Sequence, residues 1–172
     1  MKKQEIKKID LACGQNKQEG FIGVDIKASK DVDIVMDLEK FPWKFKSDSI
    51  DEINCSHYIE HTVDLIKFMD ECCRILKTGG KMTVIAPYYA NIRAWQDPTH
   101  KRAISEASFL YFNKAWREQN KLTHYDIKSD FDFTYGYQID AAWSNRNEEA
   151  RNFAIKHYIN VISDIQVVLT KK

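Results

Sequence analysis

The chain has 172 residues, of which 44% are hydrophobic and 30% are charged, and its formal net charge is +1. The near-neutral charge gives no broad reason to bind nucleic acid, and no apolar run approaches the roughly 20 residues of a membrane-spanning helix. Segment 1–8 lacks the apolar stretch of a secretory signal. We therefore expect a single domain over residues 1–172 that is located in the cytoplasm and binds neither nucleic acid nor membranes.

Five short apolar segments in the first half of the chain predict β-strands. These segments span residues 6–12, 21–26, 32–36, 50–56 and 81–86. Their spacing indicates a mainly parallel sheet, because a helical segment separates the last two strands and parallel neighbours need such a crossover. The connections between the first three strands are too short for a full helix, so we expect reduced helices there.

The helix between the fourth and fifth strands is predicted over residues 63–76. Its apolar residues recur at spacings of three and four, which places them on one face. Thr62 is the expected N-cap, and Gly79 with Gly80 is the expected stop.

The second half of the chain predicts a short helix over 105–112, a half-solvated strand over 125–139, a helix over 147–158 and a strand over 162–169. Two late strands that flank a helix suggest an antiparallel hairpin at the sheet edge. The fold class is therefore α/β and Rossmann-like.

The four cysteines are Cys13, Cys55, Cys72 and Cys73. They form no C-x-x-C pair, and three of them lie in apolar segments. We interpret all four as reduced core residues rather than as metal ligands.

Small and acidic residues follow the first four predicted strands. In open α/β sheets a ligand binds beyond the carboxyl ends of the strands. Gly14 lets the backbone approach a ligand closely, and Asp25 can accept hydrogen bonds from a ribose diol. Asp37 and Leu38 suit an exocyclic amine and an apolar ring edge. Each signal taken alone is better explained by a turn or a helix cap than by a ligand contact, so the hypothesis depends on the set.

Five segments together resemble the class I S-adenosylmethionine-dependent methyltransferases, close to the small type 11 group. They are IDLACG (9–14), GFIGVDI (20–26), DIVMDLEKFPW (33–43), SIDEINCSHYIEH (49–61) and FMDECCRILKTGGKMTVIAP (68–87). The resemblance covers about the first half of the chain, and Thr78 stands where the last segment usually has proline. It implies a Rossmann-like class I fold with S-adenosylmethionine as the cofactor.

The resemblance also implies which residues hold the cofactor. Asp10, Ala12 and Gly14 would lie against its amino-acid end, and Asp25 would hold the ribose. Asp37 and Leu38 would hold the adenine. The residues expected at the pocket floor or beside these positions are Ser56, His57, Tyr58, Cys13 and Ile26.

Two features depart from the family pattern. Ala12 replaces one glycine of the first motif, and the crossover helices after the first two strands are missing. One face of the sheet would then need cover from the aromatic second half or from a partner subunit, so a homodimer is a hypothesis. The same short connection disfavours NAD, because a dinucleotide fold needs a helix N-terminus for the pyrophosphate.

The segment 87–102 is the candidate acceptor side, since it is polar, aromatic and longer than a simple connection. His100 is the first candidate for a general base, with Asp97 and Tyr88 beside it. An alternative of equal weight is that Asp97 and Thr99 stabilise a proline turn and that His100 caps the next helix.

No metal site is predicted, because the spacing of the candidate ligands does not match a known pattern. The alternative is a metal bound by Asp97, His100 and either His57 or His61. For His61 a structural hydrogen bond is the favoured role.

The acceptor is predicted mainly by exclusion. The N/D-P-P-Y-type segment that base-modifying amino-methyltransferases carry after the fourth strand is missing, and the chain is short. We therefore predict a small-molecule or sugar acceptor, with O- or N-methylation undecided. A non-catalytic binding module is the alternative, and an NAD-dependent oxidoreductase is a weaker one.

Overall fold

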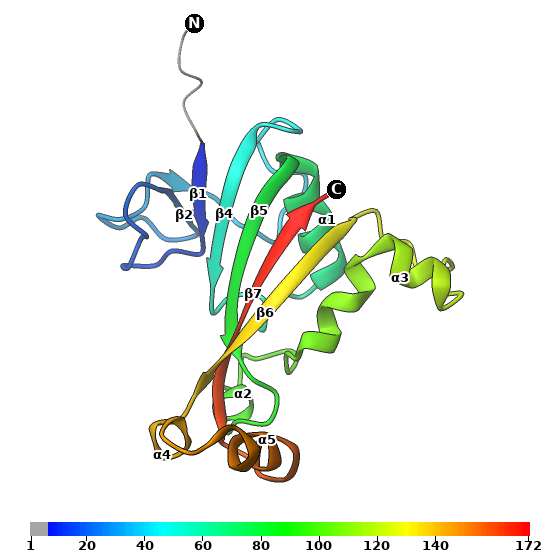
Figure 1. Cartoon of the computed structure of the whole chain (residues 1–172). Coiled ribbons are helices and arrows are strands. Elements are labelled where there is room, and N and C mark those ends of the chain that lie inside the picture. The colour runs from blue at the N-terminus through cyan, green and yellow to red at the C-terminus, as the bar shows by residue number, and fades with distance from the viewer. Residues whose placement is uncertain (1–6) are drawn as a thin grey trace, which may run out of the picture.

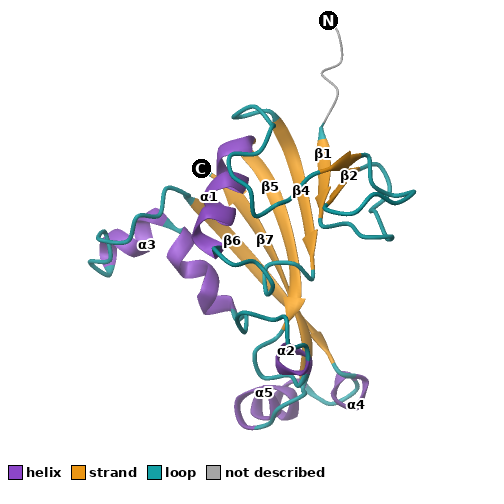
Figure 2. Ribbon diagram, turned by 180° about the vertical axis from the view of Figure 1, so that it is seen from behind, coloured by secondary structure: helices purple, strands orange, loops and turns teal. Residues whose placement is uncertain are grey.

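The computed structural model describes residues 7–172 and shows a twisted sheet with helices packed against it (Figures 1 and 2). Residues 1–6 lie outside the described residues. They include Ile6, where the first strand is predicted to begin, and most of segment 1–8, which was considered as a secretory signal. The elements in chain order are β1 (Lys8–Leu11), β2 (Ile22–Asp25), β3 (Ile34–Val35), β4 (Ile50–Ser56), α1 (Leu65–Ile75), β5 (Leu76–Pro87), α2 (Arg93–Gln96), the 3-10 helix η1 (Glu106–Phe112), α3 (Lys114–Gln119), β6 (Phe131–Ile139), α4 (Ala141–Ser144), α5 (Glu148–His157) and β7 (Ile162–Lys171).

The sheet has seven strands in the order β3-β2-β1-β4-β5-β7-β6. The first five strands pair in parallel, whereas β7 is antiparallel to both β5 and β6. The predicted fold class is thereby confirmed, including the antiparallel C-terminal hairpin. In the described chain no helix separates β1 from β2 or β2 from β3, as expected from their short connections. The carboxyl ends of β1, β2 and β4 therefore meet at one edge of the sheet.

The crossover helix α1 differs at both ends from the prediction. Its N-cap is Asp64, whose carboxylate accepts from the Lys67 N–H at 3.0 Å, whereas the predicted cap Thr62 is fully buried. No glycine ends the helix, because extended backbone at Leu76 leads directly into β5. Gly79, with φ +77°, lies in a bulge between the Ile50–Leu76 and Glu52–Lys81 pairs. The bulge makes β5 longer than the predicted 81–86.

The helices α1 and η1 lie on one face of the sheet, α3 lies beyond its β6 edge, and residues 7–172 place no helix on the opposite, bare face (Figures 1 and 2). On the covered face Phe109 of η1 packs against Phe133, with ring centroids 6.0 Å apart. The aromatic second half therefore does not cover the bare face, contrary to the expectation.

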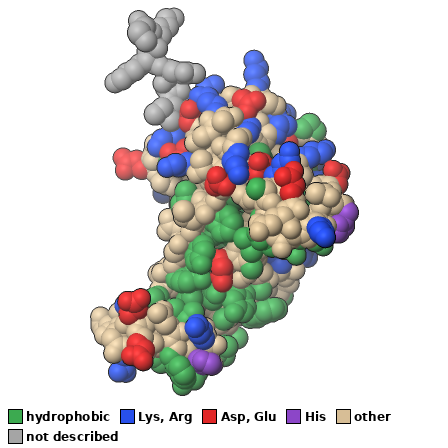
Figure 3. Space-filling view, turned by 45° about the vertical axis from the view of Figure 1, so that its right-hand side comes forward, with side chains coloured by type: hydrophobic (Ala, Val, Ile, Leu, Met, Phe, Trp, Pro, Cys, Tyr) green, Lys and Arg blue, Asp and Glu red, His purple; other side chains and the backbone are tan. Residues whose placement is uncertain are grey.

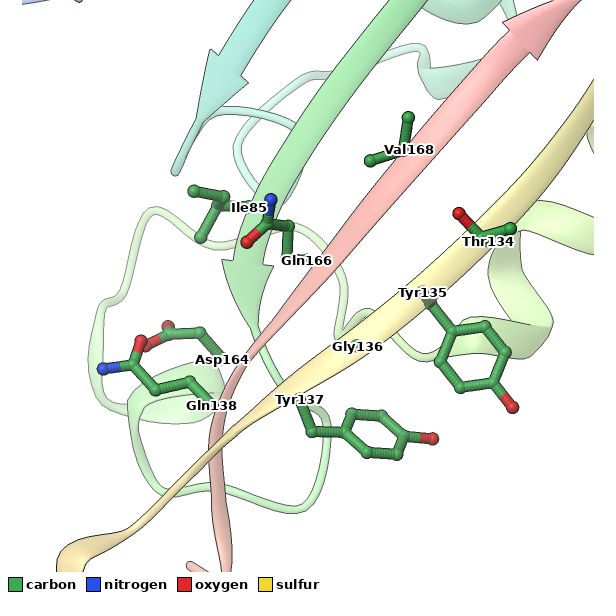
Figure 4. A pocket seen from close by; sticks show the side chains of 9 residues that line it. All are labelled: Ile85, Thr134, Tyr135, Gly136, Tyr137, Gln138, Asp164, Gln166 and Val168. Carbon is green, nitrogen blue, oxygen red and sulfur yellow. The ribbon is translucent and has the colours of Figure 1, made fainter.

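The bare face combines polar and apolar side chains. It carries a shallow hollow of about 500 Å³, in which Gln166 lies beside Ile85 and Gly136 in the strand register (Figure 4). Thr134, Gln138 and Asp164 line the same hollow. Tyr135, Tyr137 and Val168 also line it, so part of the surface that this face exposes to water is apolar.

The second half of the chain also contains differences from the prediction. The strand β6 begins only at Phe131, because the preceding loop is held against α1 by Asp70, whose carboxylate accepts from the backbone of Lys128 and Ser129. The helix α3 was not predicted. The long β6–β7 hairpin carries α4 and α5 at its tip (Figure 1).

An ion pair inside the covered face fixes the loop over residues 37–47. Glu71 is buried and accepts from the Trp43 N–H at 2.6 Å and from Arg74 Nη2 at 2.6 Å. Arg74 also donates to the carbonyl oxygens of Trp43 and Phe45. Burial opposes ionisation of Glu71, but the hydrogen bonds from Arg74 and Trp43 outweigh it and lower the pKa of this carboxyl.

We expect Glu71→Gln to destabilise the protein by about 1.5–3 kcal/mol, the usual contribution of hydrogen bonds to a charged group. Urea unfolding is the measurement. Because the pKa of Glu71 is lowered on folding, the advantage of the wild type should be complete above the ordinary value of 4.5 and should be lost as the pH falls. Glu118→Gln is the control: it removes an exposed pair with Lys114 at 3.9 Å and should change stability by less than about 0.5 kcal/mol. Equal effects of the two substitutions would contradict the assignment.

Candidate functional site

A cavity of about 300 Å³ lies at the carboxyl ends of β1, β2, β3 and β4. It is formed by side chains from the loops that follow these strands. Its lining residues are Ala12, Asp25, Ile26, Met36, Asp37, Leu38, Glu39, Tyr58, His61 and Val63. Six of the eleven residues predicted to bind the cofactor are therefore brought together here.

Asp25 lies at the end of β2 and is held by two backbone donors. One carboxylate oxygen accepts from the Gly14 N–H at 3.0 Å, and the other accepts from the Lys27 N–H at 3.0 Å. A carboxylate has about four acceptor positions. Asp25 therefore keeps lone pairs for two hydroxyl donors, while the backbone bonds fix its direction.

The segment after β3 forms the apolar wall of the cavity. Leu38 is buried, and its carbonyl oxygen accepts from Trp43 Nε1 at 3.2 Å. Asp37 accepts from the Glu39 N–H at 3.0 Å, which turns the chain at this point. The wall thus combines the Met36 and Leu38 side chains with a carboxylate, a combination that suits a planar base with an exocyclic amine.

Tyr58 and Glu39 close the cavity from the β4 side. The Tyr58 hydroxyl donates to Glu39 Oε1 at 3.1 Å, and the Val63 N–H donates to the same oxygen at 3.1 Å. Burial raises the pKa of Tyr58, and the nearby charge of Glu39 raises it further. The phenol therefore stays protonated and acts as a fixed donor in this wall.

The other five predicted cofactor residues do not line the cavity: they are Asp10, Cys13, Gly14, Ser56 and His57. Asp10 is 2% exposed, and its carboxylate accepts from the Gln18 N–H at 2.8 Å and from Asn54 Nδ2 at 2.6 Å. Its evident role is to hold the loop after β1 against β4. The His57 ring lies near Asp164 of β7, 4.0 Å from a carboxylate oxygen, rather than at the cavity. Direct cofactor contact by these residues stays a prediction.

The predicted catalytic residues are only partly brought together. His100 and Asp97 share a small cavity of about 100 Å³, with 3.9 Å between Nε2 and Oδ2. Hydrogen bonds from the hydroxyl and the backbone N–H of Thr99 lower the pKa of Asp97. Tyr88 is buried elsewhere, and its hydroxyl donates to Glu106 at 3.2 Å.

His61 connects the two regions. It lines the cofactor cavity, and its ring lies 4.6 Å from the His100 ring, centroid to centroid. A structural hydrogen bond is the role expected for His61 from the sequence, and its Nδ1 lies 2.9 Å from the Thr99 hydroxyl oxygen. Its place at the cavity was missed, as were those of Met36, Glu39 and Val63. Met36 and Glu39 are the sequence neighbours of Asp37 and Leu38, and this adjacency could have predicted their place at the cavity.

The model of the methyltransferase domain family matches residues 9–84 of the chain. A search of curated proteins finds no match. Among solved structures, a methyltransferase from Archaeoglobus fulgidus is 18% identical with a TM-score of 0.67, covering 96% of this chain and 86% of the other. A methyltransferase from Thermotoga maritima is 15% identical with a TM-score of 0.60, and the match covers 98% of this chain and 83% of the other. Phosphoethanolamine N-methyltransferase 2 from Haemonchus contortus, solved with S-adenosylmethionine, is 13% identical with a TM-score of 0.51, covering 98% and 49%.

The described chain therefore has the fold of the class I S-adenosylmethionine-dependent methyltransferases. Residues 9–84 carry the type 11 methyltransferase domain, as predicted from the sequence motifs. The predicted class of enzyme is confirmed at this level, and S-adenosylmethionine is the cofactor of that class. No helix in residues 7–172 combines the length and apolar character needed to cross a bilayer.

Ala12, the departure from the family's glycine, occupies the backbone conformation that glycine favours, with φ +54°. This conformation costs a residue with a Cβ about 1–2 kcal/mol, and glycine adds about 0.4–1 kcal/mol of unfolded-state entropy. We expect Ala12→Gly to stabilise the protein slightly, by about 1 kcal/mol or less, in urea unfolding. Ala28→Gly, at an exposed loop position without positive φ, is the control and should be destabilising. An equal loss of stability in both variants would mean that Ala12 is not strained.

Proposed function

We propose that this chain binds S-adenosylmethionine in the cavity at the ends of β1 to β4 and methylates a small-molecule or sugar acceptor. The observation that carries the proposal is the gathering of Ala12, Asp25, Asp37, Leu38 and Tyr58 around one cavity. When bound, S-adenosylmethionine supplies a methyl group on a sulfonium, which an acceptor's lone pair displaces from sulfur while the acceptor gives up a proton.

The cavity fits the adenosine part of the cofactor. Asp25 offers free acceptor positions to a ribose diol, with its direction fixed by two backbone N–H groups. Met36 and Leu38 offer an apolar wall to the base, and Asp37 offers an acceptor beside it. Ala12, the smallest side chain at this rim, leaves room for close approach of the ligand.

The acceptor would lie on the side of His61 and the segment 87–102. This segment exposes apolar and aromatic side chains, namely Tyr89, Ile92 and Trp95, near the exposed Tyr158 and Ile159. Figure 3 shows hydrophobic side chains gathered over the lower part of the molecule, below the charged upper part. Such a surface suits an organic acceptor better than a phosphate backbone. His100 and Asp97 are the proposed groups for taking the acceptor's proton.

We also propose the cytoplasm as the compartment, which the four free, buried cysteines support. A homodimer stays a hypothesis, motivated by the apolar side chains that the bare face exposes. Light scattering at micromolar concentration tests it, and a monomer would count against it.

Asp25→Ala is the direct test of the cofactor site. The loss of hydrogen bonds to a charged acceptor, worth about 1.5–3 kcal/mol, should weaken S-adenosylmethionine binding by about 10- to 150-fold in calorimetric titration. Asp126→Ala, at an exposed position in the loop before β6, is the control and should leave the dissociation constant unchanged. An unaltered constant in Asp25→Ala would remove Asp25 from the site.

Catalysis needs a separate measurement, because binding alone does not distinguish an enzyme from a binding module. The full chain is incubated with labelled S-adenosylmethionine and a pool of small molecules and sugars. Transfer of label to a pool component supports the proposal. Cofactor binding without transfer to any pool would favour the binding module.

A further inference from the structure

We propose that Glu60, His61 and His100 form a binding site for a divalent transition-metal ion, with Zn²⁺ as the best fit. One ligand atom from each of these residues lies within 4.8 Å of the other two. A carboxylate with two imidazole nitrogens is a donor set that zinc takes in catalytic sites, where a fourth position stays open. The site adjoins the cofactor cavity, because His61 lines both.

The hydrogen bonds around the two histidines set both rings for metal binding. His100 Nδ1 lies 3.0 Å from the Ala94 carbonyl oxygen. A carbonyl oxygen only accepts, so Nδ1 carries the proton, and Nε2 of the neutral ring presents a lone pair. Metal-ligating histidines show this arrangement, with the other ring nitrogen donating to a carbonyl or a carboxylate.

A hydrogen bond to Thr99 likewise places the proton of His61 on Nδ1. The Thr99 hydroxyl donates to Asp97 Oδ1 at 2.7 Å, so its oxygen is free to accept from His61 Nδ1 at 2.9 Å. This leaves Nε2 of His61 with its lone pair. The chain from Asp97 through Thr99 to His61 is thus an outer shell that orients one ligand.

The third ligand, Glu60, has a buried carboxyl group that a bound cation would stabilise. Its side chain is 2% exposed, and neither carboxylate oxygen has a hydrogen-bond partner among the described residues. A carboxylate in such a place is costly unless it is paired or bound to a metal. The rival partner is His57, whose Nδ1 lies 3.5 Å from Glu60 Oε1. Glu60 raises the pKa of His57, so the charged form of this ring would compete with a metal ion for the carboxylate.

Backbone contacts hold the two ligand segments together. The Lys101 N–H donates to the Glu60 carbonyl oxygen at 2.7 Å, and Arg102 Nη1 donates to the Ile59 carbonyl oxygen at 2.9 Å. The segment that carries His100 is therefore fixed against the segment that carries Glu60 and His61. Bonds of 2.0–2.2 Å in a tetrahedral site need ligand atoms about 3.4 Å apart. The ligand atoms lie within 4.8 Å of one another, so they would move together by up to about 1.4 Å when the ion binds.

The four cysteines do not compete for the ion. All four are buried, and burial raises the pKa of each thiol. Because the thiolate is the metal ligand, zinc should bind the histidine site instead. Mg²⁺, which prefers oxygen ligands, should bind weakly.

A catalytic role for this ion rests on the proposed function. An ion beside His61 would face the acceptor side of the proposed cofactor cavity and act as a Lewis acid on an acceptor hydroxyl. Because the ion would occupy His100 Nε2, Asp97 alone of the two proposed groups would then be left to take the acceptor's proton. The hydroxyl class of acceptor is thereby favoured over the amine class.

The test is calorimetric titration of the chelator-treated full chain with Zn²⁺, without S-adenosylmethionine. One Zn²⁺ should bind per chain. His61→Ala and His100→Ala should each weaken binding by more than about 100-fold, since loss of an outer-shell partner alone costs about 10- to 100-fold. Thr99→Val, which removes only that partner, should fall in the 10- to 100-fold range. His157→Ala, an exposed histidine on α5, is the matched control and should bind as the wild type does.

A thermal-shift series makes the result independent of changes in folding. Zn²⁺ should raise the melting temperature of the wild type and His157→Ala, but not that of His61→Ala, His100→Ala or Glu60→Gln. Wild-type protein that binds no Zn²⁺ at micromolar concentration would overturn the proposal, and so would variants that bind it as tightly as the wild type. Titration of S-adenosylmethionine with chelator present tests the proposed function separately, so either idea can fail alone.

Discussion

The buried carboxylate of Asp10 is the interaction on which the site depends. It joins the Asn54 side chain of β4 to the backbone of Gln18, in the loop that leads into β2. This loop replaces the usual crossover helix, so no packed helix holds it in place. Without Asp10 the ends of β1, β2 and β4 would still be adjacent, but the backbone that presents Ala12 and Gly14 would lack its anchor. Asp10 therefore anchors this loop, and its predicted contact with the cofactor stays a prediction.

A second support lies on the other side of the cavity. The loop after β3 is fixed by Glu71 and Arg74 of the covered face, through the backbone of Trp43 and Phe45. Glu39 then connects this loop to Tyr58 after β4. Each wall of the cavity is thus held by a buried or half-buried polar contact between segments distant in sequence. The site is formed by loops, yet its walls are fixed by the sheet and α1.

The sequence was sufficient for the strands and for the residues that directly follow them, because both depend on local pattern. Asp25, Asp37 and Leu38 lie at the cavity for this reason. Contacts between distant segments were not predictable in the same way. The N-cap of α1 is Asp64, two residues after the predicted Thr62. Tyr88 directly follows β5, but its hydroxyl donates to Glu106. His61 was read as structural because its proximity to Thr99 and His100 arises only when the segment 97–102 folds back over the end of β4.

The tip of the β6–β7 hairpin contacts the proposed acceptor side and not the cavity at the ends of β1 to β4. It touches the segment after β5 through Asn160, whose N–H donates to the Ala90 carbonyl oxygen and whose side chain accepts from the Ile92 N–H. The cavity at the ends of β1 to β4 lies at the opposite half of the sheet and is not lined by α4 or α5. Under the proposed function, a change of length or sequence at the tip would alter the acceptor side and leave the proposed donor site unchanged.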